Sequence, residues 1–221
     1  TVDDYVGQTV ELGIGGGAVV SGSFQSFDQS YLQAALANLG PHFVGVTQLP
    51  LDVSDESLMA LDACRVRALR FNVRRGGREA VEHLSYFAER VHEMLGWHAE
   101  IYCDSRHLGE LETALCRLPA VSIDHLGLSK KGLPLLYRLV EKGVRVKATG
   151  FGRVDFAVSQ VLRRLYDINP QALMFGTDLP STRSPRPFNP VDIEIIGNTL
   201  GDDGARRVLW ENAAEFYRLP N

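Results

Sequence analysis

AVSIDHLGLSKKGLPLLYRLVEKGVRVKA, residues 120–148, is the stretch that decides the fold. Its short apolar runs at 120–124 and 144–148 predict β-strands, and the run at 132–142 between them has the spacing of an amphipathic helix. Two strands joined through a helix lie parallel in one sheet, because the crossover returns the chain to the same end. The stretch therefore predicts a β–α–β unit.

The same alternation of strand and helix runs through the whole chain and gives seven strand–helix units. Most strand runs are apolar on both faces, as a parallel sheet covered on both sides requires. The units are nearly uniform in length and no long crossover marks a reversal of strand order, which favours a (β/α)8 barrel over a doubly wound open sheet. The other expected strands are 17–23, 42–49, 66–71, 98–103 and 172–176, and the other expected helices are 30–39, 55–64, 79–95, 108–118, 156–168, 190–200 and 202–217.

The chain is about one strand short of a complete barrel. It has 221 residues, whereas a (β/α)8 barrel typically takes about 250. Its first residues, TVDDYVGQTVELG, predict a helix, because Thr1 and Asp4 stand at the spacing of a capping box. We expect one barrel domain over 1–221 that is N-terminally incomplete and lacks the first strand. The two strand edges left unpaired would favour association, so a homo-oligomer is a possible state.

Composition and charge narrow the classes of partner. The formal net charge of −4 argues against nucleic acid and anionic membranes, since these partners need a basic face. No apolar run approaches the roughly 20 residues that a membrane-spanning helix needs. The three cysteines are scattered and form no C-x-x-C pair, so we expect no disulfide framework and a reducing, cytoplasmic location.

Polar side chains stand at nearly every predicted strand end, which is where enzymes of this fold carry out their chemistry. The pair His125 and Asp178 carries the most weight, because strand alternation allows both to point into the barrel. A histidine and an aspartate that converge there can activate water, or hold a metal that does so. The structural alternatives are a hydrogen-bonded core histidine for His125 and a helix cap for Asp178.

Two arginines at strand ends predict a site for anions. A barrel-facing Arg70 needs a negative partner, which is either a substrate carboxylate or an ion pair with Glu100 or Asp104. Arg153 follows another strand and is either a second anion clamp or a loop charge.

Two further charged residues fall in the middle of strands. An isolated charge at the position of Glu100 or Lys147 would be costly, so we expect at least one of them to be paired inside the barrel, with the other as a candidate partner.

The motifs around these residues resemble the amidohydrolase superfamily, and in particular its amidohydrolase-related branch, which includes 2-pyrone-4,6-dicarboxylate lactonase. The resemblance runs from about Gly17 to the end of the chain and implies a TIM-barrel hydrolase. It is carried by VRALRFN, WHAEIY, VSIDHLG, VKATGFGR, MFGTDLP and ENAAEFYRL, which begin at residues 66, 97, 121, 146, 174 and 211.

The resemblance implies a role for each matching residue. His125 stands where the family has its strand-six histidine, and Asp178 where it has the strand-eight aspartate that acts as general base. The residues that would hold the substrate are Arg70, Tyr102 and Arg153, with Ser23 as a polar contact from strand two and Arg75 as a further arginine.

The chain also departs from the family pattern. The family's first strand ends in His-x-His, and this sequence contains no such motif, in agreement with the missing strand. Metal-dependent members carry a strand-five histidine where this chain has Tyr102, a feature that the lactonase branch shares with its metal-free hydrolysis. After Asp178 the chain reads Leu179-Pro180-Ser181, without the histidine that the lactonase has nearby.

The leading hypothesis is hydrolysis of a carboxylated lactone or related cyclic ester, with Asp178 as general base and no cofactor. One alternative is a zinc-dependent decarboxylase or amidohydrolase, with His125 and Asp178 among the metal ligands. The other is a non-catalytic barrel that binds a small carboxylated molecule.

Overall fold

Seven parallel strands form one curled sheet whose spatial order follows the sequence. The computed structural model describes residues 1–22, 24–73 and 83–220. Each strand pairs in parallel with the next, and the described residues show no pairing that joins the first strand to the last. The ring predicted from the sequence is therefore present and open by one strand. The strands are β1 (Gly17–Val20), β2 (Phe43–Thr47), β3 (Val66–Asn72), β4 (His98–Tyr102), β5 (Val121–Ile123), β6 (Arg145–Ala148) and β7 (Leu173–Phe175).

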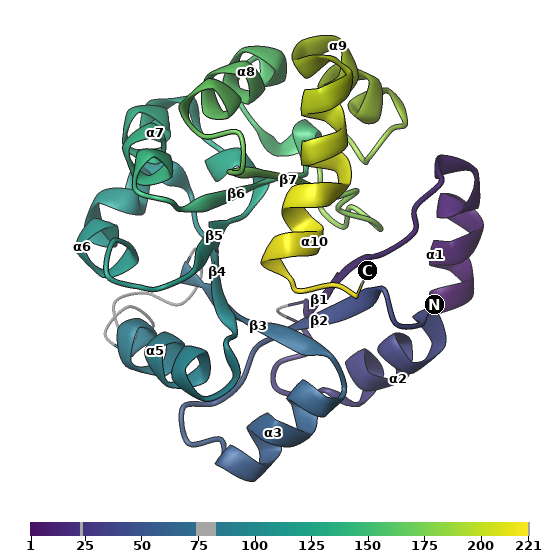
Figure 1. The fold of residues 1–221 in the computed structure, drawn as a ribbon, viewed down its shortest axis with the longest axis vertical. Coiled ribbons are helices and arrows are strands. Elements are labelled where there is room, and N and C mark those ends of the chain that lie inside the picture. The colour runs from purple at the N-terminus through teal and green to yellow at the C-terminus, as the bar shows by residue number, and fades with distance from the viewer. Residues whose placement is uncertain (23, 74–82, 221) are drawn as a thin grey trace.

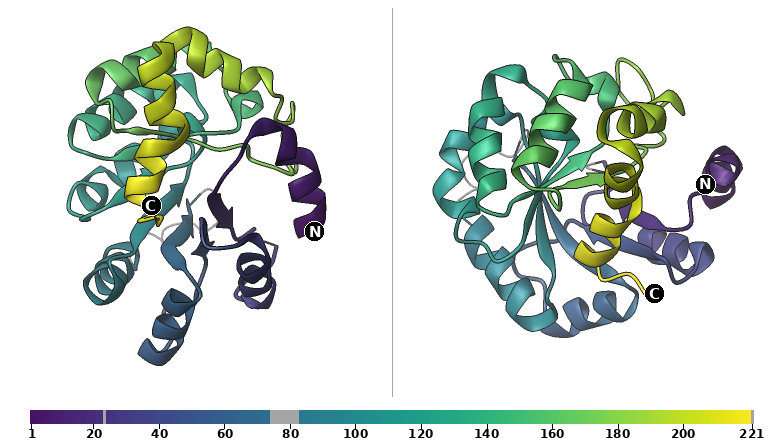
Figure 2. Two further views of the ribbon diagram at one scale, coloured as in Figure 1. Left: turned by 45° about the vertical axis from the view of Figure 1, so that its right-hand side comes forward. Right: turned by 45° about the horizontal axis from the view of Figure 1, so that its top comes forward.

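Helices surround the sheet on its outside (Figures 1 and 2). Helix α7 shows the physical reason for this arrangement. Its apolar residues recur at helical spacing, so that Leu136, Leu139 and Val140 are buried against the sheet. Helix α1 begins at the capping box that the sequence predicts between Thr1 and Asp4. The helices are α1 (Val2–Thr9), α2 (Ser30–Leu39), α3 (Asp55–Ala63), α5 (Leu84–Leu95), α6 (Glu112–Leu115), α7 (Leu133–Glu141), α8 (Val158–Ile168), α9 (Val191–Arg206) and α10 (Asn212–Phe216).

Three predicted helices differ from the structure. The helix expected at 108–118 is only α6, because a 3-10 helix at Ser105–Glu110, capped by the side chain of Asp104, takes up the preceding residues. The two helices expected at 190–217 form one bent run. It is interrupted at Gly201, whose φ is +72°, and by a π-helical turn at Arg207–Glu211. No helix in the described ranges combines the length and apolar character needed to cross a membrane.

The C-terminal segment fills part of the inside of the ring. Tyr217 packs with Val44 and Val46 of β2, Ala68 of β3 and Met174 of β7. These residues come from both ends of the open sheet, so the segment after α10 bridges them. The hydroxyl of Tyr217 also contacts the buried carboxylate of Glu100.

Candidate active site

A cavity of about 1730 Å³ opens at the C-terminal ends of the strands and extends along the gap between β1 and β7. All five of the predicted site residues that the structure describes line it, namely Arg70, Tyr102, His125, Arg153 and Asp178. The other two, Ser23 and Arg75, lie outside the described residues. The strand ends therefore meet at one mouth, as the fold predicts.

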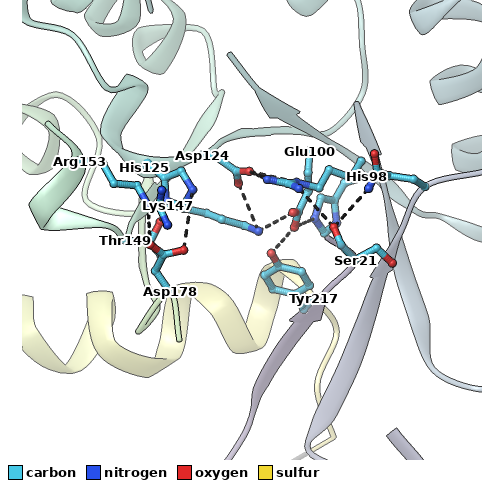
Figure 3. Close-up of polar contacts among 12 residues, drawn as sticks. Ser21, His98, Glu100, Asp124, His125, Lys147, Thr149, Arg153, Asp178 and Tyr217 are labelled. Carbon is cyan, nitrogen blue, oxygen red and sulfur yellow. Dashed lines mark hydrogen bonds and ion pairs between the residues drawn. The ribbon is translucent and has the colours of Figure 1, made fainter. Parts of the chain in front are cut away.

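His125 and Asp178 face each other across this mouth (Figure 3). Nε2 of His125 lies 4.0 Å from Oδ1 of Asp178, so the two atoms are close but not hydrogen-bonded. Both residues have positive φ, +50° for His125 and +57° for Asp178. A left-handed conformation costs a non-glycine residue about 1–3 kcal/mol and tends to occur at functional sites. The convergence of the two side chains agrees with the geometry that water activation needs.

His125 lies at the cavity for a different reason than strand alternation. Alternation places His125 on the same face as Val121 and Ile123, but these two side chains pack with Leu139 on the helix side of the sheet. The side chain that continues the inner face is Asp124, which lines the cavity. His125 reaches the same cavity because its left-handed backbone turns the chain there.

A hydrogen bond fixes the ring of His125. Its Nδ1 lies 2.7 Å from the hydroxyl oxygen of Thr149, which follows β6. Burial lowers the pKa of His125 from its ordinary value, against the opposing charges of Asp124 and Asp178. The imidazole is therefore neutral at pH 7. When Thr149 donates to Nδ1, the proton of the ring is on Nε2 and points toward Asp178 and the cavity.

Arg153 is already paired within the protein. Its Nε donates to Oδ2 of Asp178 at 2.6 Å, and its Nη2 donates to the carbonyl oxygen of Thr182 at 3.1 Å. The sequence allowed two interpretations of Arg153, an anion clamp or a loop charge. Neither predicted an ion pair with Asp178. The anion that Arg153 holds in this structure is the carboxylate of Asp178.

Arg70 also has a partner in the protein, and it is neither of the two named from sequence. Its Nη2 and Nε donate to Oδ2 of Asp124 at 2.8 and 3.2 Å, and its Nη1 donates to the carbonyl oxygen of Ser21 at 3.2 Å. The guanidinium lies 4.9 Å from the ring centre of Tyr102, in a cation–π contact. Asp104, the alternative partner, instead binds Arg106.

Sequence reasoning placed Asp124 at a strand end but gave it no role; the residue is 2% exposed and joins two cations. Besides Arg70 it faces Lys147, whose Nζ lies 3.4 Å from Oδ1. Burial alone would raise the pKa of the Asp124 carboxyl, but the charges of Lys147 and Arg70 outweigh burial and hold the pKa well below its ordinary value. The sequence signal that could have identified this role is the position of Asp124, directly after β5 and one residue before His125.

The charges of Glu100 and Lys147 pair inside the barrel, as expected from their mid-strand positions. Lys147 binds Oε2 of Glu100, and the Tyr217 hydroxyl donates to Oε1 of the same carboxylate. His98 Nε2 lies 3.3 Å from Oε1 (Figure 3). Glu100 is fully buried, and this set of partners offsets the cost of burying its charge.

The described residues supply fewer donors than a catalytic zinc ion usually takes. Such sites usually take three ligands from the protein. His125 and Asp178 offer two, and across residues 1–22, 24–73 and 83–220 there is no group of three or more His, Cys, Asp or Glu side chains placed to hold a metal. One oxygen of Asp178 is also occupied by the cationic Arg153.

Comparison with protein families identifies the family of the chain. The model of the amidohydrolase family Amidohydro_2 matches residues 1–219. The chain belongs to the amidohydrolase family. It is therefore a hydrolase of this superfamily. A comparison with curated proteins found none that matches.

Solved structures agree with the family. A protein of Pseudomonas putida, provisionally named 2-pyrone-4,6-dicarboxylic acid hydrolase, is 26% identical, with 98% of this chain and 86% of that chain covered and a TM-score of 0.80. A protein of Acinetobacter baumannii with the same provisional name and citric acid bound is 20% identical, with coverages of 99% and 89% and a TM-score of 0.83. The second likeness supports the fold alone.

Proposed function

We propose that this amidohydrolase opens a lactone or related cyclic ester that carries carboxylates, with Asp178 as the general base. The observation that carries the proposal is the approach of His125 Nε2 to Asp178 Oδ1 at 4.0 Å in a cavity lined by arginines. Support comes from the Pseudomonas putida relative, whose provisional name describes hydrolysis of a pyrone dicarboxylate.

The chemistry follows from the positions of the two side chains. Oδ2 of Asp178 accepts from Arg153, which leaves Oδ1 to take a proton from a water molecule in the cavity. The oxygen of that water attacks the carbonyl carbon of the ester, and the ring C–O bond breaks when the tetrahedral intermediate collapses. A neutral His125 with its proton on Nε2 would donate to the developing oxyanion. The proton on Asp178 then passes to the alkoxide or enolate that leaves.

Two cationic side chains at the mouth can contact an anionic substrate. Arg70 and Lys147 both line the cavity, and each shares its charge with Asp124. Arg70 has five N–H groups, of which the hydrogen bonds to Asp124 and Ser21 use three. Within residues 1–22, 24–73 and 83–220 no further acceptor meets its other two N–H groups, which can donate to a substrate carboxylate. The aromatic ring of Tyr102 lies beside this guanidinium. The proposed reaction needs no cofactor.

The test measures hydrolysis of 2-pyrone-4,6-dicarboxylate and of related carboxylated lactones by the loss of ring absorbance. Asp178→Asn keeps the size of the side chain and removes its basicity, so it should lower kcat by about 10²–10⁴-fold. The matched control is Asp155→Asn, because Asp155 is an exposed carboxylate that accepts a backbone N–H from Lys130 at 2.5 Å and, among the described residues, has no hydrogen bond to another side chain. Undiminished turnover by Asp178→Asn, or no turnover of any carboxylated lactone by the unaltered chain, would overturn the proposal.

A further inference from the structure

Arg153 holds the proposed base from a position that is itself fixed. It ends a 3-10 turn at Phe151–Arg153, and its backbone N–H donates to the carbonyl oxygen of Gly150 at 2.8 Å. Its guanidinium joins Asp178 to the carbonyl of Thr182, so one side chain connects the end of β6 to the loop after β7. The side chain is 13% exposed. Little solvent therefore competes for these contacts.

Two glycines allow the turn to come this close. Gly150 has a φ of +60°, and a Cβ there would stand 2.8 Å from Arg153 Cδ and 2.8 Å from His125 Nδ1. A Cβ on Gly152 would stand 2.1 Å from the carbonyl oxygen of Arg186, in the loop after β7. Contacts below 3.0 Å would force the neighbouring atoms to move. The GFGR turn at 150–153 is thus shaped to bring an arginine between His125 and the loop that carries Asp178.

We propose that Arg153 is a positioning residue for Asp178 and does not anchor the carboxylate of the substrate. A free aspartate rotates about its last side-chain bond and presents either oxygen in many directions. The hydrogen bond from Arg153 to Oδ2 removes that freedom and leaves Oδ1 turned toward His125, 4.0 Å away. The second bond, to the carbonyl of Thr182, sets the plane of the guanidinium and hence the direction of the first. This inference rests on the proposed role of Asp178 as the base.

The two roles of Arg153 predict different kinetics. An anchor binds the substrate carboxylate, so its loss raises KM for carboxylated substrates and leaves a neutral ester of the same ring unaffected. A positioning residue acts through Asp178, so its loss lowers kcat for both substrates and changes KM little. A misplacement of about 1 Å at a reacting group costs on the order of 100-fold in rate.

The kinetic experiment compares Arg153→Met and Arg153→Lys with the unaltered chain, using a carboxylated lactone and its methyl ester. We expect kcat to fall by about 10–100-fold for Arg153→Met on either substrate, with KM within about threefold. Arg153→Lys should recover only part of the rate, since a lysine cannot bind Asp178 and the Thr182 carbonyl in one plane. Arg106→Met is the control, because Arg106 also pairs with a rim aspartate, Asp104, at 2.8 Å. A rise in KM confined to the carboxylated lactone, with kcat unchanged, would overturn the inference.

A second measurement does not depend on turnover. In the ligand-free protein, the Nε–H of Arg153 should give a ¹⁵N–¹H resonance that exchanges slowly with water, assigned by its loss in Arg153→Lys. The resonance should disappear in Asp178→Ala and persist in Asp155→Ala. If no lactone is hydrolysed but this pattern holds, the proposed reaction fails and the pairing of Arg153 with Asp178 stands. A resonance unaffected by Asp178→Ala would contradict the positioning role itself.

Discussion

Replacing Lys147 with methionine tests the buried charge cluster under the active site. Four charges, Arg70 and Lys147 against Glu100 and Asp124, balance there in the native protein. Lys147→Met keeps a long apolar stem but leaves one uncompensated negative charge among side chains that are at most 10% exposed. Removing one partner of a buried ion pair costs about 3–5 kcal/mol. The free energy of unfolding, measured with urea at pH 7, should fall by that amount.

The double variant Glu100→Gln/Lys147→Met supplies the control. It removes both charges, and the amide can still meet Tyr217 and His98, so its stability should exceed that of Lys147→Met by about 2 kcal/mol or more. Strict additivity of the two single substitutions would refute the reasoning, as would a loss below about 1 kcal/mol for Lys147→Met.

The same variant should show an inverted dependence on pH. In the native protein burial acts to raise the pKa of Glu100, but Lys147 and His98 together outweigh burial and the net pKa is lowered. A lowered pKa stabilises the fold above the ordinary value of 4.5 and ceases to do so as the pH falls. Without Lys147, burial dominates and the folded-state pKa rises above 4.5. The stability deficit of Lys147→Met should therefore shrink as the pH is lowered from 7 toward 4.5. A constant deficit over this range would contradict the assignment.

Three further predictions concern single side chains. Thr149→Val removes the hydrogen bond to His125 Nδ1 without a change in shape, so kcat for the lactone should fall by about 2–10-fold, and an unchanged kcat would show that the bond does not orient the ring. Burial lowers the pKa of His125, so the imidazole stays neutral at pH 6.5 and a pH–rate profile should show no loss of activity from protonation of His125 at that pH. A loss of activity near pH 6.5 that is absent in His125→Gln would refute this. Tyr217→Phe removes a donor to the buried Glu100 and should lower the free energy of unfolding by about 1.5–3 kcal/mol, whereas equal stability by urea denaturation would mean that water replaces the hydroxyl.

The fold could be predicted from sequence because its signals are local. Each strand run is apolar and each helix run is amphipathic, as at β5 and α7, and regular alternation of the two leaves few topologies. The boundaries of the less regular elements could not be predicted in this way. The 3-10 helix that replaces part of the helix expected at 108–118 depends on the Asp104 cap, a contact of one side chain with the backbone.

That five of the predicted residues line one cavity could be predicted from the rule that strand ends meet, but the pairing of their side chains could not. Arg70 and Asp124 are 54 positions apart in sequence, and their contact depends on the register of three strands. The orientation of His125 depends on a left-handed backbone, which is uncommon for any non-glycine residue and could not be predicted at this position from the sequence. Tyr217 was missed because it follows α10 and is remote in sequence from β4, whose Glu100 it binds.

The most direct test of the account is a double-mutant cycle on the rate of lactone hydrolysis, with Asp178→Asn, His125→Gln and the double variant. If the carboxylate and the imidazole act on one water and one carbonyl, each single substitution should remove most of the catalysis, and the double variant should be no slower than the slower single variant. Losses that multiply in the double variant would show that the two side chains act independently. Full activity in either single variant would remove that residue from the mechanism.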